Sequence, residues 1–189
     1  MDYSSADITV ITPTVAGREA FLADCKNSVN WQTQPVAEHI IENANGRKAP
    51  VVRNAMVKKV KTDWILTLDD DDWLYPEYVE NIVPHMHKAD VIFTWPRWQG
   101  VKGQPHFLYK TFSPDTLEEF CPWQQTAVIR KSYWEKVGGQ KTVHLEDRQL
   151  WIDLRDAGAR FYTVEKALFV YRWHDGQARG GIRVPAKNS

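Results

Sequence analysis

Four consecutive aspartates at positions 69–72 are the residues whose types and spacing point most directly to chemistry. They follow a mostly apolar run at 64–68, which is typical of a buried strand. Side chains alternate along an extended chain, so Asp69 and Asp71 are expected to face away from the other two. Two carboxylates about 4 Å apart repel by roughly 4 kcal/mol at an effective dielectric constant of about 20, so a positive partner is expected.

A divalent cation is one interpretation of this cluster. Mg²⁺ and Mn²⁺ take oxygen ligands and often share their coordination shell between one or two carboxylates and substrate phosphates. The other interpretation is a solvated acidic turn before a helix that begins at Pro76, because carboxylates are favourable near the positive end of a helix. The aspartates by themselves leave both interpretations open.

The composition is that of one globular domain covering residues 1–189. A formal net charge of zero gives no global attraction to nucleic acid or to an anionic membrane. Only two cysteines, Cys25 and Cys121, are present, which fits a reducing compartment. The sequence shows no signal peptide and no apolar run long enough to span a membrane, so a cytoplasmic location is expected.

Strand and helix patterns alternate through the first half of the chain. This order predicts an α/β fold with a mostly parallel sheet flanked by helices. In such sheets the ligand lies beyond the carboxyl ends of the strands, so the loops after Thr12, Glu42 and Leu68 are expected to share one crevice. The predicted strands lie at 8–12, 38–42, 64–68 and 90–94, and the predicted helices at 18–31, 50–61 and 76–87.

The second half is less regular. A loop is predicted at 95–103, and the tail at 176–189 is expected to be mobile. The predicted strands lie at 106–112, 125–130 and 168–173, and the predicted helices at 115–120, 131–137 and 146–156.

Six short motifs occur in a fixed order along the chain: residues 8–14, Arg53-Asn54, residues 68–72 with Pro76, residues 129–139, Glu146-Asp147 with Leu150-Trp151, and residues 171–174. In this order the chain resembles the family 2 glycosyltransferases of the GT-A fold over nearly its whole length. The resemblance implies a Rossmann-like central sheet in a single domain. It also implies that residues of about 7–95 bind a nucleotide sugar and that those of about 96–175 form the acceptor and catalytic half.

The resemblance implies transfer of a sugar from a nucleotide diphosphate to an acceptor hydroxyl, with a metal neutralising the leaving group. Asp69 and Asp71 match the DxD motif of the family. Asp71 and His174 are the implied metal ligands, and Asp69 is expected at the donor ribose or the metal shell. Imidazole suits Mn²⁺ better than Mg²⁺, so Mn²⁺ is favoured. A surface histidine that steadies its loop is the alternative for His174.

Further donor-binding residues follow from the same resemblance. Arg53 is expected beside the diphosphate, although a solvated basic face is the alternative. The second strand departs from the family pattern, because Glu42 and Asn43 stand where many members carry two aspartates. Glu42 or Asn43 is the expected contact to the base, with Glu42 preferred, and a UDP-sugar is favoured. Thr12, Pro13 and Thr14 are expected beneath the nucleotide base, and Asp70 in the donor loop.

Asp147 matches the catalytic base of the family. An inverting transfer is a single displacement, so one carboxylate near the acceptor suffices. The alternative is an acid that only stabilises a helix start. Glu146 is expected to support Asp147, and Trp98 and Trp123 are candidates for stacking on the acceptor side, with core packing as the alternative.

Three other functions compete with this prediction. A glycoside hydrolase also uses two carboxylates, but needs no DxD motif at a strand end. A nucleotidyltransferase would show a Gly-rich basic signature near the first strand, and a degenerate transferase would only bind a nucleotide sugar or glycan. The expected acceptor is a glycan, a protein side chain, a lipid-linked sugar or a modified DNA base, the last kept open by basic residues at 47–61. A bacterial or phage source is expected.

Overall fold

The computed structural model describes residues 3–100 and 113–174. The predicted strand at 106–112 and the predicted mobile tail lie outside the described residues. The strands are β1 Ile8–Thr14, β2 Glu38–Asn43, β3 Trp64–Thr67, β4 Trp73–Leu74, β5 Val91–Gln99, β6 Ala127–Arg130 and β7 Phe161–Arg172. The helices are α1 Glu19–Asn30, α2 Ala49–Val57, α3 Tyr78–Ile82, α4 Lys131–Lys136 and α5 Glu146–Asp156.

The seven strands form one sheet in the order β2-β1-β3-β6-β5-β7-β4. Strands β1, β2, β3, β5 and β7 run in one direction, and β6 and β4 run against their neighbours. The predicted α/β fold with a mostly parallel sheet is therefore confirmed. The four strands predicted in the first half, β1, β2, β3 and β5, all run in one direction, but β6 lies between β3 and β5 and pairs antiparallel with both.

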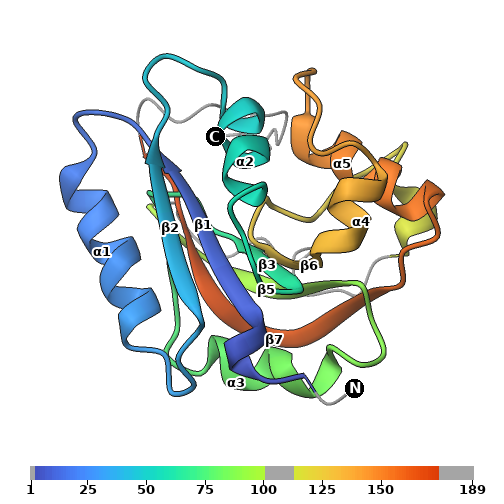
Figure 1. The fold of residues 1–189 in the computed structure, drawn as a ribbon, viewed down its shortest axis with the longest axis horizontal. Coiled ribbons are helices and arrows are strands. Elements are labelled where there is room, and N and C mark those ends of the chain that lie inside the picture. Colours follow the sequence, from blue (N-terminus) through green and yellow to red (C-terminus); the bar gives the residue numbers. More distant parts are fainter. Residues whose placement is uncertain (1–2, 101–112, 175–189) are drawn as a thin grey trace, which may run out of the picture.

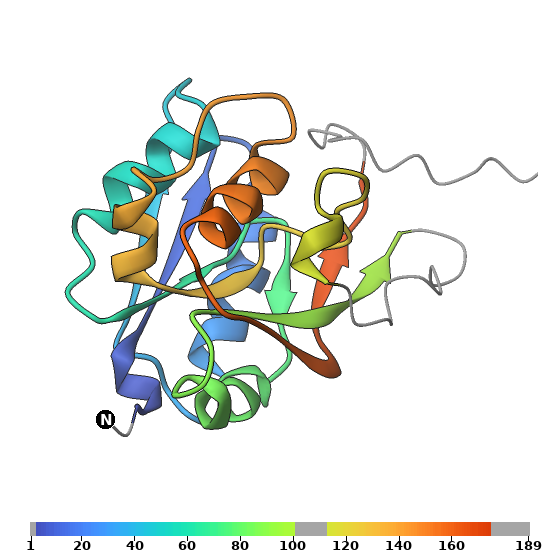
Figure 2. The same ribbon diagram turned by 90° about the vertical axis from the view of Figure 1, so that its right-hand side faces the viewer.

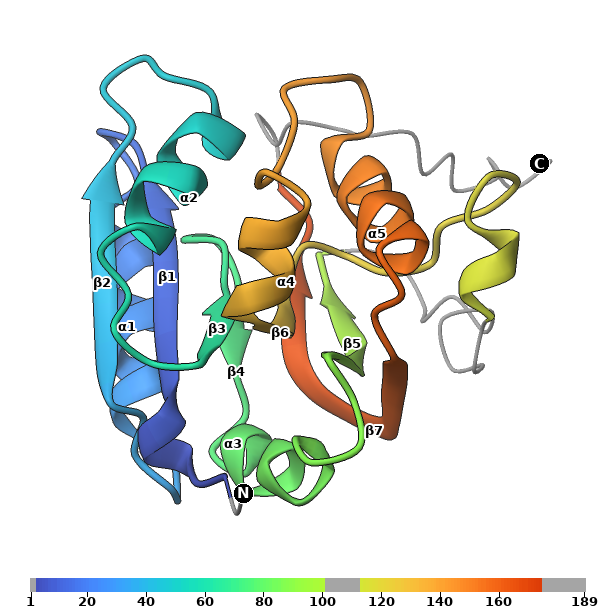
Figure 3. The ribbon, with the colours of Figure 1, turned by 45° about the vertical axis from the view of Figure 1, so that its right-hand side comes forward.

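Helices cover both faces of the sheet (Figures 1 and 3). Helix α1 lies on one face, and α2, α4 and α5 lie on the other. Strand β1 shows why both faces are covered: Ile8 and Val10 pack in the core beside α1, whereas Ile11 packs in the core beside α2. Successive side chains of this buried strand point to opposite faces of the sheet and pack in two separate hydrophobic cores, as in other parallel sheets.

The functional loops gather at one end of this sheet. Strands β1, β2 and β3 are parallel, so their carboxyl ends lie at the same edge. The starts of α2 (cyan) and α5 (orange) lie at that same end (Figure 2). The positive ends of two helix dipoles therefore face the region beyond the strands, where an anionic ligand is favoured.

Several element boundaries differ from the sequence predictions. Strand β5 continues to Gln99 where a loop was expected, because it pairs with β7 through register shifts around Trp95. The predicted helix at 76–87 is divided into α3 and a 3-10 turn, Val83–His85, which contains Pro84. The predicted helix at 115–120 is a 3-10 turn, Pro114–Thr116, and the two-residue strand β4 was not predicted. None of the helices in the described part of the chain has the length and apolar character needed to cross a membrane.

The buried carboxylate of Asp90 forms ion pairs with two arginines at the end of the sheet opposite the loops that follow β1, β2 and β3. Asp90 is 3% exposed and accepts hydrogen bonds from Arg130 Nε and Arg160 Nε, each at 2.9 Å. Burial acts to raise the pKa of Asp90, but the hydrogen bonds from Arg160 and Arg130 outweigh it and leave the pKa below its usual value. The ionised form therefore contributes stability above the unfolded-state pKa of about 3.9, and this contribution is lost as the pH falls through the folded-state value.

We expect Asp90→Asn to lower the free energy of unfolding at pH 7 by about 1–3 kcal/mol, because the amide cannot pair with two guanidinium groups. The difference from the wild type should shrink as the pH falls from 7 to 3. Urea unfolding across this range measures it, with Glu77→Gln at an exposed site as the control. A loss that is equal at every pH would contradict the ion-pair explanation.

Candidate active site

The four aspartates form a turn rather than an extended strand. Strand β3 ends at Thr67, and the backbone N–H of Asp72 donates to the carbonyl of Asp69 at 3.2 Å. The expected alternation of side chains is therefore wrong, because the chain reverses direction where the carboxylates begin. Each carboxylate instead has its own set of partners, and Arg18 is shared by Asp70 and Asp71.

Asp70 and Asp72 hold the turn in place. Asp70 Oδ2 accepts from Thr14 Oγ1 at 2.7 Å, and Asp70 Oδ1 accepts from Arg18 Nη1 at 2.8 Å. Asp72 Oδ1 accepts from the backbone N–H of Arg172 at 2.9 Å. These carboxylates are 3% and 1% exposed, and they tie the turn to β1, to the start of α1 and to β7.

Asp71 lies beside His174, which the sequence predicts as its fellow metal ligand. His174 Nε2 is 2.9 Å from Asp71 Oδ2, and Arg18 Nη1 donates to the same oxygen at 3.2 Å. Burial and the neighbouring Asp69 raise the pKa of Asp71, and His174 and Arg18 act against them. Asp71 is therefore harder to ionise than an exposed aspartate.

The donor set at Asp71 fits a hard divalent ion with few protein ligands. No group of three or more His, Cys, Asp or Glu side chains in residues 3–100 and 113–174 is placed to hold a metal. One carboxylate and one imidazole nevertheless leave positions for phosphate oxygens and water, which is how Mg²⁺-type ions are commonly bound. Arg18 also contacts Asp70, so it can release Asp71 and keep an ion pair.

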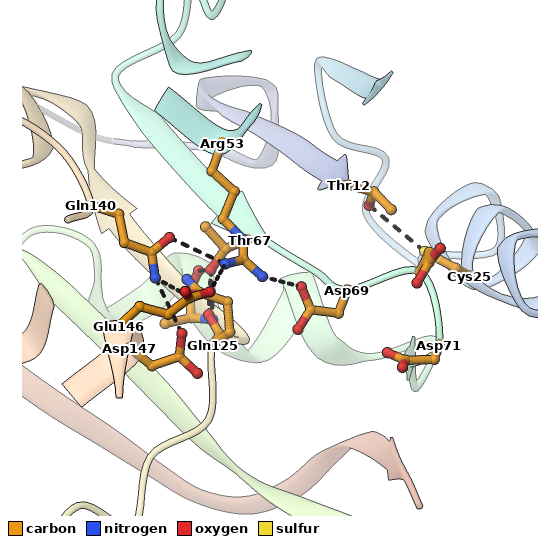
Figure 4. A network of polar contacts seen from close by, with 12 residues as sticks. Thr12, Cys25, Arg53, Thr67, Asp69, Asp71, Gln125, Gln140, Glu146 and Asp147 are labelled. Carbon is orange, nitrogen blue, oxygen red and sulfur yellow. Dashed lines mark hydrogen bonds and ion pairs between the residues drawn. The ribbon is translucent and has the colours of Figure 1, made fainter. Parts of the chain in front are cut away.

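Arg53 is the centre of a second group of contacts (Figure 4). Its side chain is 4% exposed, so the alternative of a solvated basic face is wrong for this residue. Arg53 Nη2 donates to Asp69 Oδ1, and Nη1 donates to Gln140 Oε1 at 3.2 Å. Nη1 also lies 3.5 Å from Glu146 Oε1. One guanidinium thus joins the aspartate turn to the start of α5.

Asp147 lies in the first turn of α5 and is partly buried. Its Oδ1 accepts a hydrogen bond from Gln140 Nε2 at 3.1 Å. Burial raises the pKa of Asp147 to about 7; Asp69 and Glu146 also raise it, and Arg53 acts against them. A carboxylate that titrates near neutral pH is suited to accept a proton in general base catalysis.

Three residues of these networks were missed at the sequence level: Arg18, Gln125 and Gln140. Gln125 and Gln140 are each 3% exposed, and Gln140 Nε2 donates to Gln125 Oε1 at 2.7 Å. The turn Gly138-Gly139 directly before Gln140 was the available signal. An amide carries no charge, so its sequence position alone did not point to the carboxylates.

Other predicted donor residues lie apart from the Arg53 network. Thr12 Oγ1 is 2.9 Å from His39 Nε2, and the Thr12 side chain faces Cys25 of α1 (Figure 4). Pro13 is paired with Glu42 across β1 and β2. The carboxylate of Glu42 forms ion pairs with Arg47 and Lys59. Contacts of these residues with a nucleotide base stay predictions.

The two tryptophans expected near the acceptor lie in aromatic clusters. Trp123 is 9% exposed and stacks on Phe93 with ring centroids 4.4 Å apart. Trp98 is 3% exposed and lies 5.0 Å from the ring of Tyr171. Both positions agree with the alternative of core packing, and an acceptor role stays a prediction.

Residues 30–153 match the family model described as Glycosyl transferase family 2. A comparison with curated proteins finds no significant match. Many solved structures have a similar fold, among them two that contain a nucleotide sugar. The first is S. aureus TarS 1-349 in complex with UDP-GlcNAc, with a TM-score of 0.72 and 16% identity over 90% of this chain and 59% of that chain. The second is the mannosyltransferase PcManGT from Pyrobaculum calidifontis in complex with GDP-Man and Mn²⁺.

PcManGT has a TM-score of 0.64 and 13% identity over 87% of this chain and 56% of that chain. The chain thus spans less than two thirds of the length of either protein. At these identities the likeness shows a shared fold, which confirms the predicted GT-A class.

The loop that carries Gln140 depends on glycine. Gly139 has φ +83, and a Cβ there would lie 2.4 Å from Asn54 Oδ1. That oxygen accepts from Trp134 Nε1 at 3.1 Å and from the backbone N–H of Gln140 at 2.9 Å. Gly138 has φ +76 but nothing within 4 Å of its Cβ position.

We therefore expect Gly139→Ala to lower the free energy of unfolding by about 2–4 kcal/mol, since strain is added and Asn54 is displaced. Gly138→Ala should cost only about 1 kcal/mol, from its left-handed backbone. Urea unfolding of the two variants measures the difference. Equal losses would show that the packing of Gly139 against Asn54 is unimportant.

Proposed function

The chain belongs to the family 2 glycosyltransferases, and we propose that it transfers a sugar from a nucleotide-diphosphate donor to an acceptor hydroxyl with inversion at the anomeric carbon. One observation carries the proposal. A continuous set of contacts runs from Asp147 through Gln140 and Arg53 to Asp69 in the aspartate turn (Figure 4). The candidate base and the candidate donor loop therefore belong to one network at the carboxyl ends of the parallel strands.

On the donor side, Asp71 and His174 would hold a divalent metal, with Mn²⁺ favoured over Mg²⁺. When bound, the metal would offset the negative charge that develops on the departing diphosphate. Arg53 would supply further positive charge beside Asp69. The Mn²⁺ present with PcManGT supports a divalent ion as cofactor.

The proposed donor is a nucleotide-diphosphate sugar, with a UDP-sugar favoured. The complexes of TarS with UDP-GlcNAc and of PcManGT with GDP-Man support this class of ligand. Thr12, Pro13 and Thr14 would pass beneath the base, and Glu42 would contact it after leaving one of its two ion pairs. The proposed acceptor carries a hydroxyl on a glycan, a protein side chain, a lipid-linked sugar or a modified DNA base.

On the acceptor side, Asp147 would take the proton of the attacking hydroxyl. The hydroxyl oxygen forms its bond to the anomeric carbon as the bond from that carbon to the diphosphate oxygen breaks. Gln140 binds Asp147 Oδ1, so Oδ2 is the oxygen proposed to receive the proton. With a pKa of about 7, Asp147 is largely ionised only above neutral pH. Transfer should therefore slow as the pH falls below about 7.

The donor site is tested by thermal unfolding with UDP, GDP, dTDP and CDP, each with Mn²⁺ or with EDTA. A ligand at 100 times its dissociation constant adds about 2.7 kcal/mol, a rise in Tm of roughly 5–10 °C for a chain of this size. We expect such a rise with one of these nucleotides and its loss with EDTA and in Asp71→Asn.

The matched control for Asp71→Asn is Asp63→Asn, at the exposed other end of β3. It should keep the full rise in Tm. If none of the four nucleotides raises the Tm of the wild type, the proposed donor site is wrong.

The role of Asp147 is tested with Asp147→Asn, measured with the donor identified above. We expect kcat to fall by about 10²–10⁴, because the amide cannot accept the proton, while the donor-induced rise in Tm is kept. Asp153→Asn, on the same helix, is the control and should retain turnover. Unchanged turnover in Asp147→Asn would remove this residue as the base, and a protein that only binds its ligand would be indifferent to the change.

A further inference from the structure

The buried side chain of Gln140 links Arg53 to Asp147. Gln140 Oε1 accepts from Arg53 Nη1 at 3.2 Å. Gln140 Nε2 donates to Asp147 Oδ1 at 3.1 Å and to Gln125 Oε1 at 2.7 Å. An uncharged side chain from the loop after α4 thus touches both the guanidinium and the candidate base.

The orientation of this amide follows from the chemistry of Arg53. A guanidinium only donates hydrogen bonds, so the Gln140 atom beside it must be the oxygen. The amide nitrogen then faces Asp147 and Gln125, and the Gln125 atom that meets it must also be an oxygen. Arg53 therefore fixes which atoms of Gln140 and Gln125 donate and which accept. As a result, one N–H of Gln140 is directed at Asp147.

The backbone of Gln140 is held independently of its side chain. Asn54 Nδ2 donates to the carbonyl of Gln140 at 2.8 Å, and the N–H of Gln140 donates to Asn54 Oδ1 at 2.9 Å. Asn54 is itself fixed by Trp134. A change of the Gln140 side chain should therefore leave the loop in place.

We propose that Gln140 is a positioning residue for sugar transfer: its amide joins Arg53 to Asp147 and fixes which carboxylate oxygen of Asp147 faces the acceptor. This inference rests on the function proposed above. Binding of Oδ1 by Gln140 sets the rotation of the carboxylate. The N–H donor also favours the ionised form, which is the form that accepts a proton.

The charged and titratable groups around Asp147 come from several elements. Arg53 of α2 is the cation. Asp69 after β3 and Glu146 of α5 oppose ionisation of Asp147. Tyr171 of β7 and Cys121 before β6 also interact with its charge. Gln140 differs from these groups because it acts on one oxygen through a neutral hydrogen bond.

Two substitutions separate positioning from simple loss of structure. Gln140→Met keeps the length of the side chain but removes its hydrogen bonds to Arg53, Asp147 and Gln125. We expect kcat to fall about 10–100-fold with the donor KM changed by less than about threefold. Hydrogen-bond partners that orient a functional group commonly contribute this much. Gln140→Glu places a negative charge beside Asp147 and should move the acid limb of the pH–rate profile upward by about one pH unit.

Gln149→Met is the matched control. Gln149 Nε2 donates to Asp153 Oδ1 at 3.0 Å. The substitution therefore removes a hydrogen bond of the same kind, from an amide to a carboxylate, on α5, the helix that carries Asp147. This variant should keep the kcat and pH profile of the wild type. The proposal would be overturned if Gln140→Met lowered kcat by the same factor at every pH and Gln149→Met lowered it equally.

A second measurement needs no enzyme activity. The titration of Asp147 is followed by carboxyl ¹³C NMR in the wild type, Gln140→Met and Gln140→Glu, with Asp147→Asn identifying the signal. We expect a higher midpoint in both Gln140 variants. An unchanged midpoint in both overturns the role of Gln140 even in an active enzyme. If no donor is transferred but the midpoints rise, the proposed function fails and the link between Gln140 and Asp147 stands.

Discussion

The burial of one guanidinium, that of Arg53, is the constraint on which the candidate site depends. A buried charge without partners costs several kcal/mol, so the chain must bring hydrogen-bond acceptors to it. Those acceptors come from separate segments: Asp69 from the turn after β3, Gln140 from the loop after α4, and Glu146 from the start of α5. Satisfying one cation therefore assembles three distant parts of the sequence around a single point. The same contacts bring Asp147 beside the aspartate turn.

This assembly also sets the balance of charge at Asp147. Burial and two neighbouring carboxylates, Asp69 and Glu146, raise its pKa, while Arg53 lowers it, and the result is a value of about 7. A stronger influence of Arg53 would leave a carboxylate that is always ionised but weakly basic. A weaker one would leave Asp147 protonated at neutral pH. The balance is suited to a base that must be ionised before reaction and accept a proton during it.

Local patterns in the sequence were sufficient for much of the fold, and the family resemblance pointed to several residues of the candidate site. The apolar runs predict β1, β2 and β3 closely, and helix α5 matches its predicted range of 146–156, because hydrophobic periodicity is a local property. The position of β6 between β3 and β5 could not be predicted, since pairing across a sheet depends on contacts between distant residues. Asp71 and His174 were paired from the order of motifs, although 103 positions separate them. Arg18 and Gln140 were missed, because an arginine before a helix and a neutral amide are common on surfaces. Their importance comes only from the carboxylates that the fold places beside them.

The aspartate turn divides its four carboxylates between two tasks. Asp70 and Asp72 are almost fully buried and are bound by Thr14, by Arg18 and by a backbone N–H, so their charges hold the turn against β1 and β7. Asp69 and Asp71 instead meet side chains that can exchange partners, namely Arg53 for the first, and His174 and Arg18 for the second. A turn fixed by two of its acids can present the other two at a constant separation. Burial and repulsion among these carboxylates raise the pKa of Asp71 and Asp72, and His174 and Arg18 act against this at Asp71. Asp70 and Asp72 thus anchor the turn that presents Asp69 and Asp71 to the residues around it.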